Sequence, residues 1–302
     1  MPSHAPPLVA LVLCLSPAVL TGQGSAPAPQ VAWWPRVPLQ GSLVRVVVRP
    51  PAGDSVTAVS GELAGEPLHF ERLADGFGAL GAVPFGARDS AAARVVIERA
   101  DSSSDTVMAA LRVGRRRVPR ERLRVARQFA QPPDSLTERI RLEQEMVQEV
   151  RQRAHETPRL WEAPFVRPIA GAVTSVFGVA RVFNEVLRSR HWGVDFAGQR
   201  GAPVRAANRG VVALVADLYY SGTTVLIDHG AGLVTGYFHL SRVLTVPGDT
   251  VRGGQLIGLV GSSGRVTKAH LHWFGAYGGI TVDPLDLLRP NGPTRLTSGP
   301  PP

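Results

Sequence analysis

Short stretches of alternating apolar and polar residues recur along the first third of the chain. Several such runs lie between Val31 and Val113, separated by glycine, proline or aspartate. Alternation of this kind is typical of half-buried strands, and short strands at close spacing favour a sandwich. The pattern predicts an immunoglobulin-like β-sandwich over residues 25–113. The predicted strands lie in SLVRVVVRP, DSVTAVSGEL, PLHFERL, GALGAVPF and ARVVIERA.

A helical period appears only after Pro133. Ser135 to Glu138 matches a capping box, and Pro158 lies where the apolar period ends. We therefore expect one helix that packs its apolar stripe on one of the β-domains, with His155 exposed near its end. The stripe consists of Leu136, Ile140, Val147, Val150 and Ala154.

The segment before this helix, GRRRVPRERLRVARQFAQPP, is strongly basic. Charge runs are usually solvated surface, so residues 114–160 are expected to form a basic linker followed by the connecting helix. Binding of an anionic polymer by the arginine run is the alternative.

The remainder of the chain returns to short β-like runs and many glycines. GVVALVADL, TTVLIDHG, LVTGYFHL and QLIGLVGSS are typical of strand and turn units, and IDHGAGLVTGYF predicts a β-hairpin. We expect a second domain, rich in antiparallel β-sheet, over residues 161–290. The Pro/Gly-rich residues 291–302 are expected to be a disordered tail.

The N-terminal apolar run, PLVALVLCLSPAVL, is shorter than the roughly 20 residues of a membrane-spanning helix. Small and polar residues follow it, which is typical of a secretory signal cleaved near Gly24 to Ala28. We expect residues 1–24 to be a signal peptide and the protein to be exported to the periplasm or cell envelope. Cys14, the single cysteine, would leave with the signal, so disulfides are excluded and a metal site would need His, Asp or Glu.

The composition is that of a globular, basic protein. The chain is 44% hydrophobic, with a formal charge of +9, and Lys268 is its single lysine. Nucleic acid, anionic membrane and anionic cell-wall polymer all attract such a protein, and net charge does not choose among them.

The histidines cluster. Five of the eight lie in the second predicted β-domain: His191, His229, His239, His270 and His272. Catalytic zinc sites take three ligands from His, Asp and Glu and leave a fourth position for water. The clustering therefore favours a metal site over accidental decoration of a β-domain.

Spacing restricts how these groups can meet. On an extended strand His191 and Asp195 would lie about 13 Å apart, so one ion reaches both only if the chain bends near Gly193, where glycine permits it. His270 and His272 share one face of a strand, with Cα atoms about 6.6 Å apart. One imidazole of that pair can bind a metal while the other faces what sits beside it.

The segments RHWGVDFAGQRGAPVRAANRGVV, IDHGAGLVTGYFHLSRV, PGDTVRGGQLIGLVGSSG and AHLHW together resemble the lysostaphin-type (LytM-type) zinc endopeptidases of bacterial cell walls. The H-x-x-x-D, Y-x-H-L and H-x-H signatures of that family occur here in order, within about residues 164–288. The resemblance implies that His191, Asp195 and His272 bind Zn²⁺. It implies that His239 and His270 are catalytic groups beside the open position, and which of them is the base stays open.

The other polar residues of this region are expected to be structural. His229 and Asp228 are interpreted as turn residues of the hairpin, and His69 in the first domain as a structural histidine. Two departures from the family pattern, at Lys268 and at Trp273–Phe274, are expected to alter the groove wall and the peptide preference.

The resemblance implies an exported zinc-dependent endopeptidase that hydrolyses peptide cross-links of peptidoglycan. The expected partner is a peptidoglycan peptide, with no nucleic acid and no stable membrane span, and a monomer is expected. One alternative is a catalytically silent cell-wall-binding regulator of other wall hydrolases. Another is a polymer-binding module with a structural metal, which three ligands argue against because structural zinc normally has four.

Overall fold

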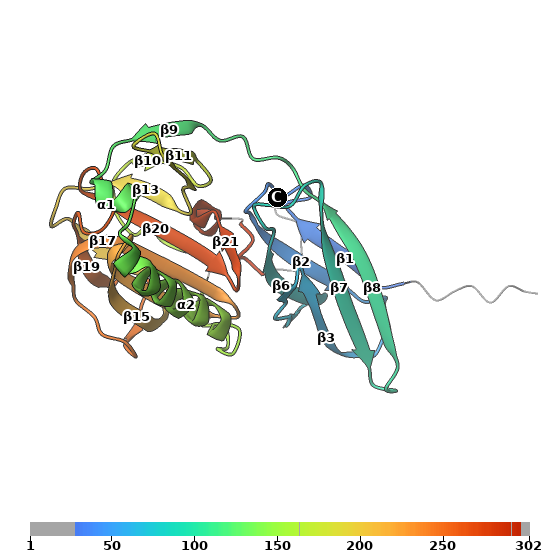
Figure 1. Ribbon diagram of the computed structural model, residues 1–302. Coiled ribbons are helices and arrows are strands. Elements are labelled where there is room, and N and C mark those ends of the chain that lie inside the picture. The colour runs from blue at the N-terminus through green and yellow to red at the C-terminus, as the bar shows by residue number, and fades with distance from the viewer. Residues whose placement is uncertain (1–27, 163, 291, 297–302) are drawn as a thin grey trace, which may run out of the picture.

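The computed structural model describes residues 28–162, 164–290 and 292–296, which form two β-rich bodies connected by an extended segment and one long helix (Figure 1). The predicted signal peptide lies outside these residues. The mainly β class is confirmed. Within the described residues, no helix combines the length and apolar character needed to cross a bilayer.

The N-terminal body is a sandwich of two four-stranded sheets. Val44 and Val46 of one sheet pack against Leu63, Ala93 and Leu111 of the other, because alternate residues of each strand face inward. The immunoglobulin-like type stays a prediction. The sheets have the orders β1 (Gln30–Trp34), β2 (Leu43–Arg49), β6 (Gly76–Ala82), β5 (Glu71–Leu73), and β4 (Glu66–Pro67), β3 (Val56–Leu63), β7 (Ser90–Arg99), β8 (Ser104–Arg112).

The C-terminal body is built on one large antiparallel sheet, as expected. Its main path runs β10 (Val173–Ser175), β13 (Val194–Ala197), β20 (His270–Tyr277), β17 (Leu233–Val243), β16 (Gly222–Gly230), β15 (Gly210–Leu218), β18 (Thr250–Val251). Three further strands join it: β14 (Pro203–Arg205), β19 (Leu256–Val260) and β21 (Ile280–Val282). The predicted hairpin is the β16–β17 pair. A short helix, η2 (Pro284–Leu288), follows β21.

The basic segment is not a free linker, which corrects the sequence-based expectation. Its residues 120–123 form β9 (Arg120–Leu123), which pairs in parallel with β11 (Ala180–Phe183) beside β12 (Leu187–Arg190). Arg116 makes an ion pair with Asp283 at 2.7 Å. Long-range pairing and a partner carboxylate hold this run against the C-terminal body, which a local charge pattern does not reveal.

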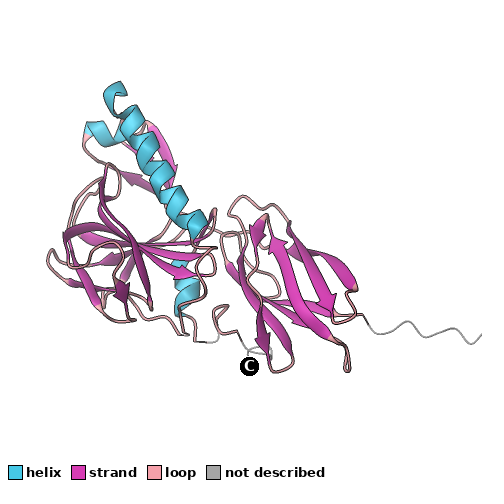
Figure 2. Ribbon diagram, turned by 90° about the horizontal axis from the view of Figure 1, so that it is seen from below, coloured by secondary structure: helices cyan, strands magenta, loops and turns pink. Residues whose placement is uncertain are grey.

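The long helix α2 (Thr137–Arg153) lies across one face of the large sheet (Figures 1 and 2). Its predicted apolar stripe packs there, since Val147, Val150 and Ala154 contact a cluster that includes Leu226 and Phe274. The expected packing is thus confirmed. A four-residue helix, α1 (Arg127–Ala130), and a 3₁₀ turn, η1 (Asp134–Leu136), precede it.

The predicted capping box is wrong. The residue before the helix is Leu136, and no side chain caps the first turn by a hydrogen bond. Ser135 lies inside the preceding 3₁₀ turn, so its hydroxyl does not occupy the capping position.

The predicted exposure of His155 is also wrong, because the end of α2 meets the N-terminal sandwich. His155 lies 2.8 Å from His69, nitrogen to nitrogen, and 3.0 Å from a carboxylate oxygen of Glu66. Tyr277 of β20 donates a hydrogen bond from its hydroxyl to the carbonyl of Pro67. The two bodies therefore share a polar interface that includes two histidines.

The predicted tail falls partly outside the described residues. Within 292–296, Thr294 is buried and the Arg295 carbonyl accepts a hydrogen bond from Arg45 at 2.7 Å. This part packs against the N-terminal body, unlike the disordered tail expected from its composition.

Candidate metal centre

Neighbouring strands of the large sheet bring the candidate residues together. In the antiparallel β13–β20 pair, Asp195 is directly opposite His272, and Ala197 is opposite His270. Directly opposed residues project from the same face of a sheet. Strand β17 flanks β20 on the other side and carries His239.

His191 reaches this group because the chain bends between it and Asp195. The bend falls at Gly193, where the sequence spacing requires one. A Cβ at this position would lie 2.5 Å from Nε2 of His272 and 2.5 Å from the Trp273 carbonyl oxygen. Only glycine fits here, so Gly193 both permits the bend and makes room for the His272 ring.

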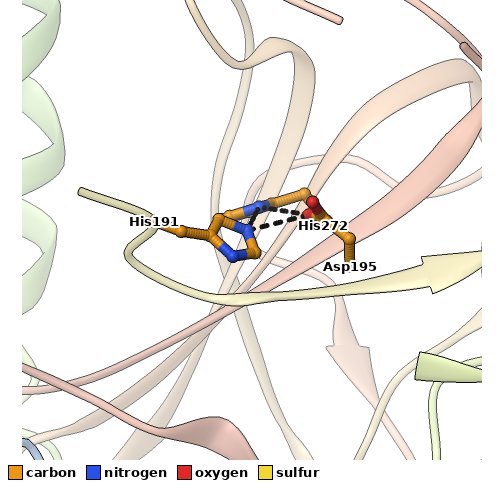
Figure 3. A group of neighbouring side chains, drawn as sticks. All are labelled: His191, Asp195 and His272. Carbon is orange, nitrogen blue, oxygen red and sulfur yellow. Dashed lines mark hydrogen bonds and ion pairs between the residues drawn. The ribbon is translucent and has the colours of Figure 1, made fainter. Parts of the chain in front are cut away.

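Three side chains converge on one point (Figure 3). His191 Nε2 lies 2.9 Å from Asp195 Oδ1 and 2.9 Å from His272 Nδ1, and His272 Nδ1 lies 2.8 Å from the same carboxylate oxygen. All three residues are buried, and within the described residues they are the group of potential ligands close enough to hold one metal ion. Zinc bonds of about 2.0–2.2 Å at tetrahedral angles separate ligand atoms by roughly 3.4 Å. The observed spacings need to open by only about half an ångström.

Outer contacts orient these donors. Nδ1 of His191 donates to the Val176 carbonyl at 2.9 Å, which leaves the Nε2 lone pair facing the cluster in the neutral ring. Arg181 donates to Asp195 Oδ2 at 2.6 Å, so Oδ1 is the oxygen turned to the histidines. Such outer partners fix the orientation of metal ligands and tune them. The donor set and its supports fit a bound Zn²⁺.

Sequence reasoning missed this outer layer. Arg181 also pairs with Glu121 of β9 at 3.0 Å, and Glu121 accepts a hydrogen bond from Ser175. Glu121 is the single acidic residue in the basic run 114–133, and that exception was the available signal. A lone acidic residue in a solvated basic linker would have no specific partner, whereas in the structure Glu121 forms an ion pair with Arg181.

Two more imidazoles lie beside the three. The ring centroid of His270 is 4.9 Å from that of His239, and His270 Nε2 lies 3.5 Å from Asp195 Oδ1. Nδ1 of His239 donates to the Ser263 carbonyl and Nδ1 of His270 donates to the Lys268 carbonyl, each at 2.8 Å. His239 adopts a left-handed backbone conformation, φ 62°, where β17 changes register against β16. A non-glycine residue held in this region is a strained feature that concentrates at functional sites.

Burial and neighbouring charges shift the pKa values of these groups in different directions. Burial alone would raise the pKa of Asp195, but hydrogen bonds with three histidines outweigh it and hold that pKa well below its ordinary value. Burial lowers the pKa of His272 to about 4 and lowers the pKa of His239 well below its ordinary value. Burial also acts to lower the pKa of His270, but hydrogen bonding to Asp195 outweighs it and the pKa is raised.

The group opens into a cavity of about 850 Å³. One wall is the sheet with the five site residues, and Ile140, Val147 and Arg151 of α2 line the other. Phe274 also lines it, whereas the Trp273 side chain is fully buried because alternate residues of β20 face opposite sides. The expectation that Trp273 forms part of the groove wall is therefore wrong.

His229, which belongs to the same histidine-rich stretch of sequence, lies away from the candidate metal centre. His229 is fully buried, with Nδ1 2.7 Å from the Arg209 carbonyl oxygen and Nε2 2.8 Å from the Thr235 hydroxyl. Asp228 accepts hydrogen bonds from the Gly230 amide and the Thr157 hydroxyl at the hairpin end. Both have the structural partners expected of turn residues.

Comparison with known proteins agrees with this geometry. Residues 189–284 match the family described as peptidase family M23. The C-terminal body carries a peptidase family M23 domain. The matched range contains all five candidate residues, from His191 to His272, whereas Arg181, Glu121 and helix α2 lie outside it.

The curated relatives match over this region only. The DD-carboxypeptidase/endopeptidase Mpg of Neisseria meningitidis is 41% identical over 100 residues, 33% of this chain and 23% of that protein. The peptidoglycan DD-endopeptidase ShyA of Vibrio cholerae is 46% identical over 83 residues, 28% of this chain and 19% of that protein. The matched part thus spans less than a quarter of the length of these relatives.

One solved structure shares the wider fold. A putative peptidase M23 from Pseudomonas aeruginosa superposes with a TM-score of 0.63 at 24% identity, over 83% of this chain and 95% of that one. The arrangement of sandwich, helix and peptidase domain therefore recurs in another protein of this fold.

Proposed function

We propose that this protein is an exported zinc-dependent endopeptidase that hydrolyses peptide cross-links of bacterial peptidoglycan. The observation that carries the proposal is the convergence of His191, Asp195 and His272 on one point of a cavity, with two more imidazoles at its edge. The names of the relatives add the substrate class, since one is a peptidoglycan DD-endopeptidase and another a DD-carboxypeptidase/endopeptidase.

His191, Asp195 and His272 would hold the metal. Zinc bound by three protein ligands supplies a water of lowered pKa and a Lewis acid for the scissile carbonyl. The remaining chemistry belongs to the two flanking histidines, whose Nδ1 hydrogens are held by backbone carbonyls.

His239 and His270 divide the proton transfers. His239 is neutral, because burial lowers its pKa, and its Nε2 lone pair can accept the proton of the attacking water. His270 Nε2 can hold a proton for the developing oxyanion and the leaving amine. The proposal rests on geometry, since a backbone carbonyl holds Nδ1 of each ring and leaves both Nε2 atoms for proton transfer.

The test is mass analysis of muropeptides released from purified sacculi. The zinc-loaded protein is expected to convert cross-linked dimers into monomers, and a His270→Ala variant is expected to keep its metal and lose the conversion. Unchanged dimers after incubation with protein whose bound zinc has been measured would overturn the peptidase proposal in favour of a silent regulator.

A further inference from the structure

Arg265 places a positive charge in the wall of the candidate active-site cavity. Its guanidinium carbon lies 4.4 Å from the ring centroid of Phe183 and 4.4 Å from that of Tyr220. All three residues line the cavity that contains the five site residues. Two aromatic faces hold a guanidinium in place while its N–H edge stays available for hydrogen bonds.

Apart from these two aromatic rings, this guanidinium has no hydrogen-bonding or ion-pairing partner in the described part of the chain. No hydrogen bond or ion pair joins its side chain to another described residue, and its nitrogens keep contact with solvent. Burial lowers the pKa of Arg265, so the charged form bears a desolvation cost that no carboxylate offsets. Charges taken out of water are normally paired.

Each of the other arginines that line the cavity makes at least one hydrogen bond or ion pair. Their partners are Glu121 and Asp195 for Arg181, Glu138 and Glu145 for Arg141, the Gly278 carbonyl for Arg151, and the Gly178 carbonyl for Arg190. Arg151 and Arg190 each bind only a backbone carbonyl, and Nη2 of Arg151 is buried without a hydrogen-bond partner. Arg265 differs from its neighbours in that none of its guanidinium donors is used by another described residue.

Arg265 is tied to the same two loops as His239. Its amide donates to the Tyr220 carbonyl at 2.9 Å, and the His239 amide donates to the next residue, Ser221, at 2.9 Å. Ser263, two residues before Arg265, provides the carbonyl that holds the His239 imidazole. The charge is thus fixed in position relative to His239, as is required of a residue that positions the substrate for reaction.

The geometry points to Arg265 as a carboxylate-binding residue of this cavity, which selects peptides that carry a free carboxylate close to the bond to be cut. The inference rests on the proposed function. A carboxylate matches the fork of N–H donors in two parallel hydrogen bonds, and the aromatic faces orient that fork.

The acidic residues around the cavity repel a bound carboxylate only weakly, because each of them is paired with an arginine. Glu121 pairs with Arg181, Glu143 with Arg139, and Glu145 with Arg141. The positive charge of Arg265 has no such compensation.

The test compares a cross-linked muropeptide dimer with the same dimer whose carboxylates are converted to carboxamides. For the wild-type protein, kcat/KM is expected to be about 10- to 100-fold higher for the carboxylate form, the range of a lost hydrogen bond to a charged group. Arg265→Gln is expected to lower kcat/KM for the carboxylate form to the level of the amide form and leave the amide form unchanged. Arg265→Lys should retain part of the preference.

Arg141→Gln is the matched control, because this cavity arginine already has two glutamate partners, and it should keep the wild-type preference. An equal loss by Arg265→Gln on both substrates, or a preference that survives this change, would overturn the inference.

A binding measurement separates this inference from the proposed function. In the His270→Ala background, calorimetry should give a Kd for the carboxylate dimer about 10- to 100-fold lower than for the amide dimer, and Arg265→Gln should remove the difference. Equal Kd values for both dimers refute the carboxylate site. Selective binding without hydrolysis by the wild-type protein refutes the peptidase alone.

Discussion

The two β-rich bodies differ in where they place polar side chains. The N-terminal sandwich alternates buried apolar and exposed polar residues, and its buried polar residues in the described chain are Ser42 and Arg45. The C-terminal body buries four histidines together with Asp195, Asp283 and Asp286. Burial of ionisable groups is costly unless partners or a ligand compensate it. The comparison places the candidate chemistry in the second body.

Replacement of His272 is expected to have the largest effect, and His229 is its matched control. His272→Ala should lower the rate of hydrolysis by more than about 100-fold. Removal of a residue that merely hydrogen-bonds to a metal ligand typically lowers metal affinity or activity about 10- to 100-fold, and loss of the ligand itself should cost more. His229→Gln should keep the metal and lose only about 1–3 kcal/mol of unfolding free energy, since buried hydrogen bonds are disturbed. Sacculus hydrolysis and denaturant unfolding measure the two. If both variants lost hydrolysis to the same extent, the assignment of His272 as a metal ligand and His229 as a structural residue would be wrong.

Gly193→Ala should come next. The added Cβ would collide with the His272 ring and the Trp273 carbonyl, so we expect metal affinity to fall by about 10- to 100-fold, the range of an altered ligand orientation. Gly86→Ala, where a Cβ meets nothing within 4 Å, is the control and should bind metal as the wild type does. Zinc titration with a competing chelator gives both constants. An unchanged affinity in Gly193→Ala contradicts the geometry of the site.

The pH dependence of stability tests the burial of His229. Burial lowers its pKa from 6.5 to about 4, so between these values the unfolded chain binds the proton and the folded one does not. The stabilisation is complete above pH 6.5 and falls by roughly 3 kcal/mol as the pH drops towards 4. His229→Gln should lose this component in urea unfolding at successive pH values. Parallel curves for the two proteins would show that His229 titrates normally in the fold.

The contact between the bodies should give the smallest effect. Glu66 accepts hydrogen bonds from the Gly279 amide and lies 3.0 Å from His155 Nε2. Glu66→Ala is expected to cost about 1 kcal/mol of unfolding free energy and to leave metal binding unchanged. Thermal unfolding and metal content are the readouts, and a loss of metal would mean that the sandwich supports the site more directly.

Local alternation predicted much of the sheet. The segment GVVALVADL coincides with β15, and the hairpin follows from its glycines. The family resemblance implied that His191, Asp195 and His272 meet, and the spacing of the first two required the bend found at Gly193. These features depend on a few neighbouring residues.

The features that sequence reasoning missed depend on distant partners. The parallel pairing of β9 joins residues about 60 positions apart, and Glu121 is useful only beside Arg181. His155 is covered by a domain that begins more than a hundred residues earlier. The 3₁₀ turn before α2 displaced the expected cap, although the local sequence matched the capping pattern.

The metal content of the purified protein tests the central claim most directly. Elemental analysis of the wild type is expected to give one zinc per chain, and Asp195→Ala, with unchanged far-UV circular dichroism, is expected to give close to none. Zinc retained in full by a folded Asp195→Ala variant, or a wild type that binds none when zinc is supplied, would contradict a metal centre formed by His191, Asp195 and His272.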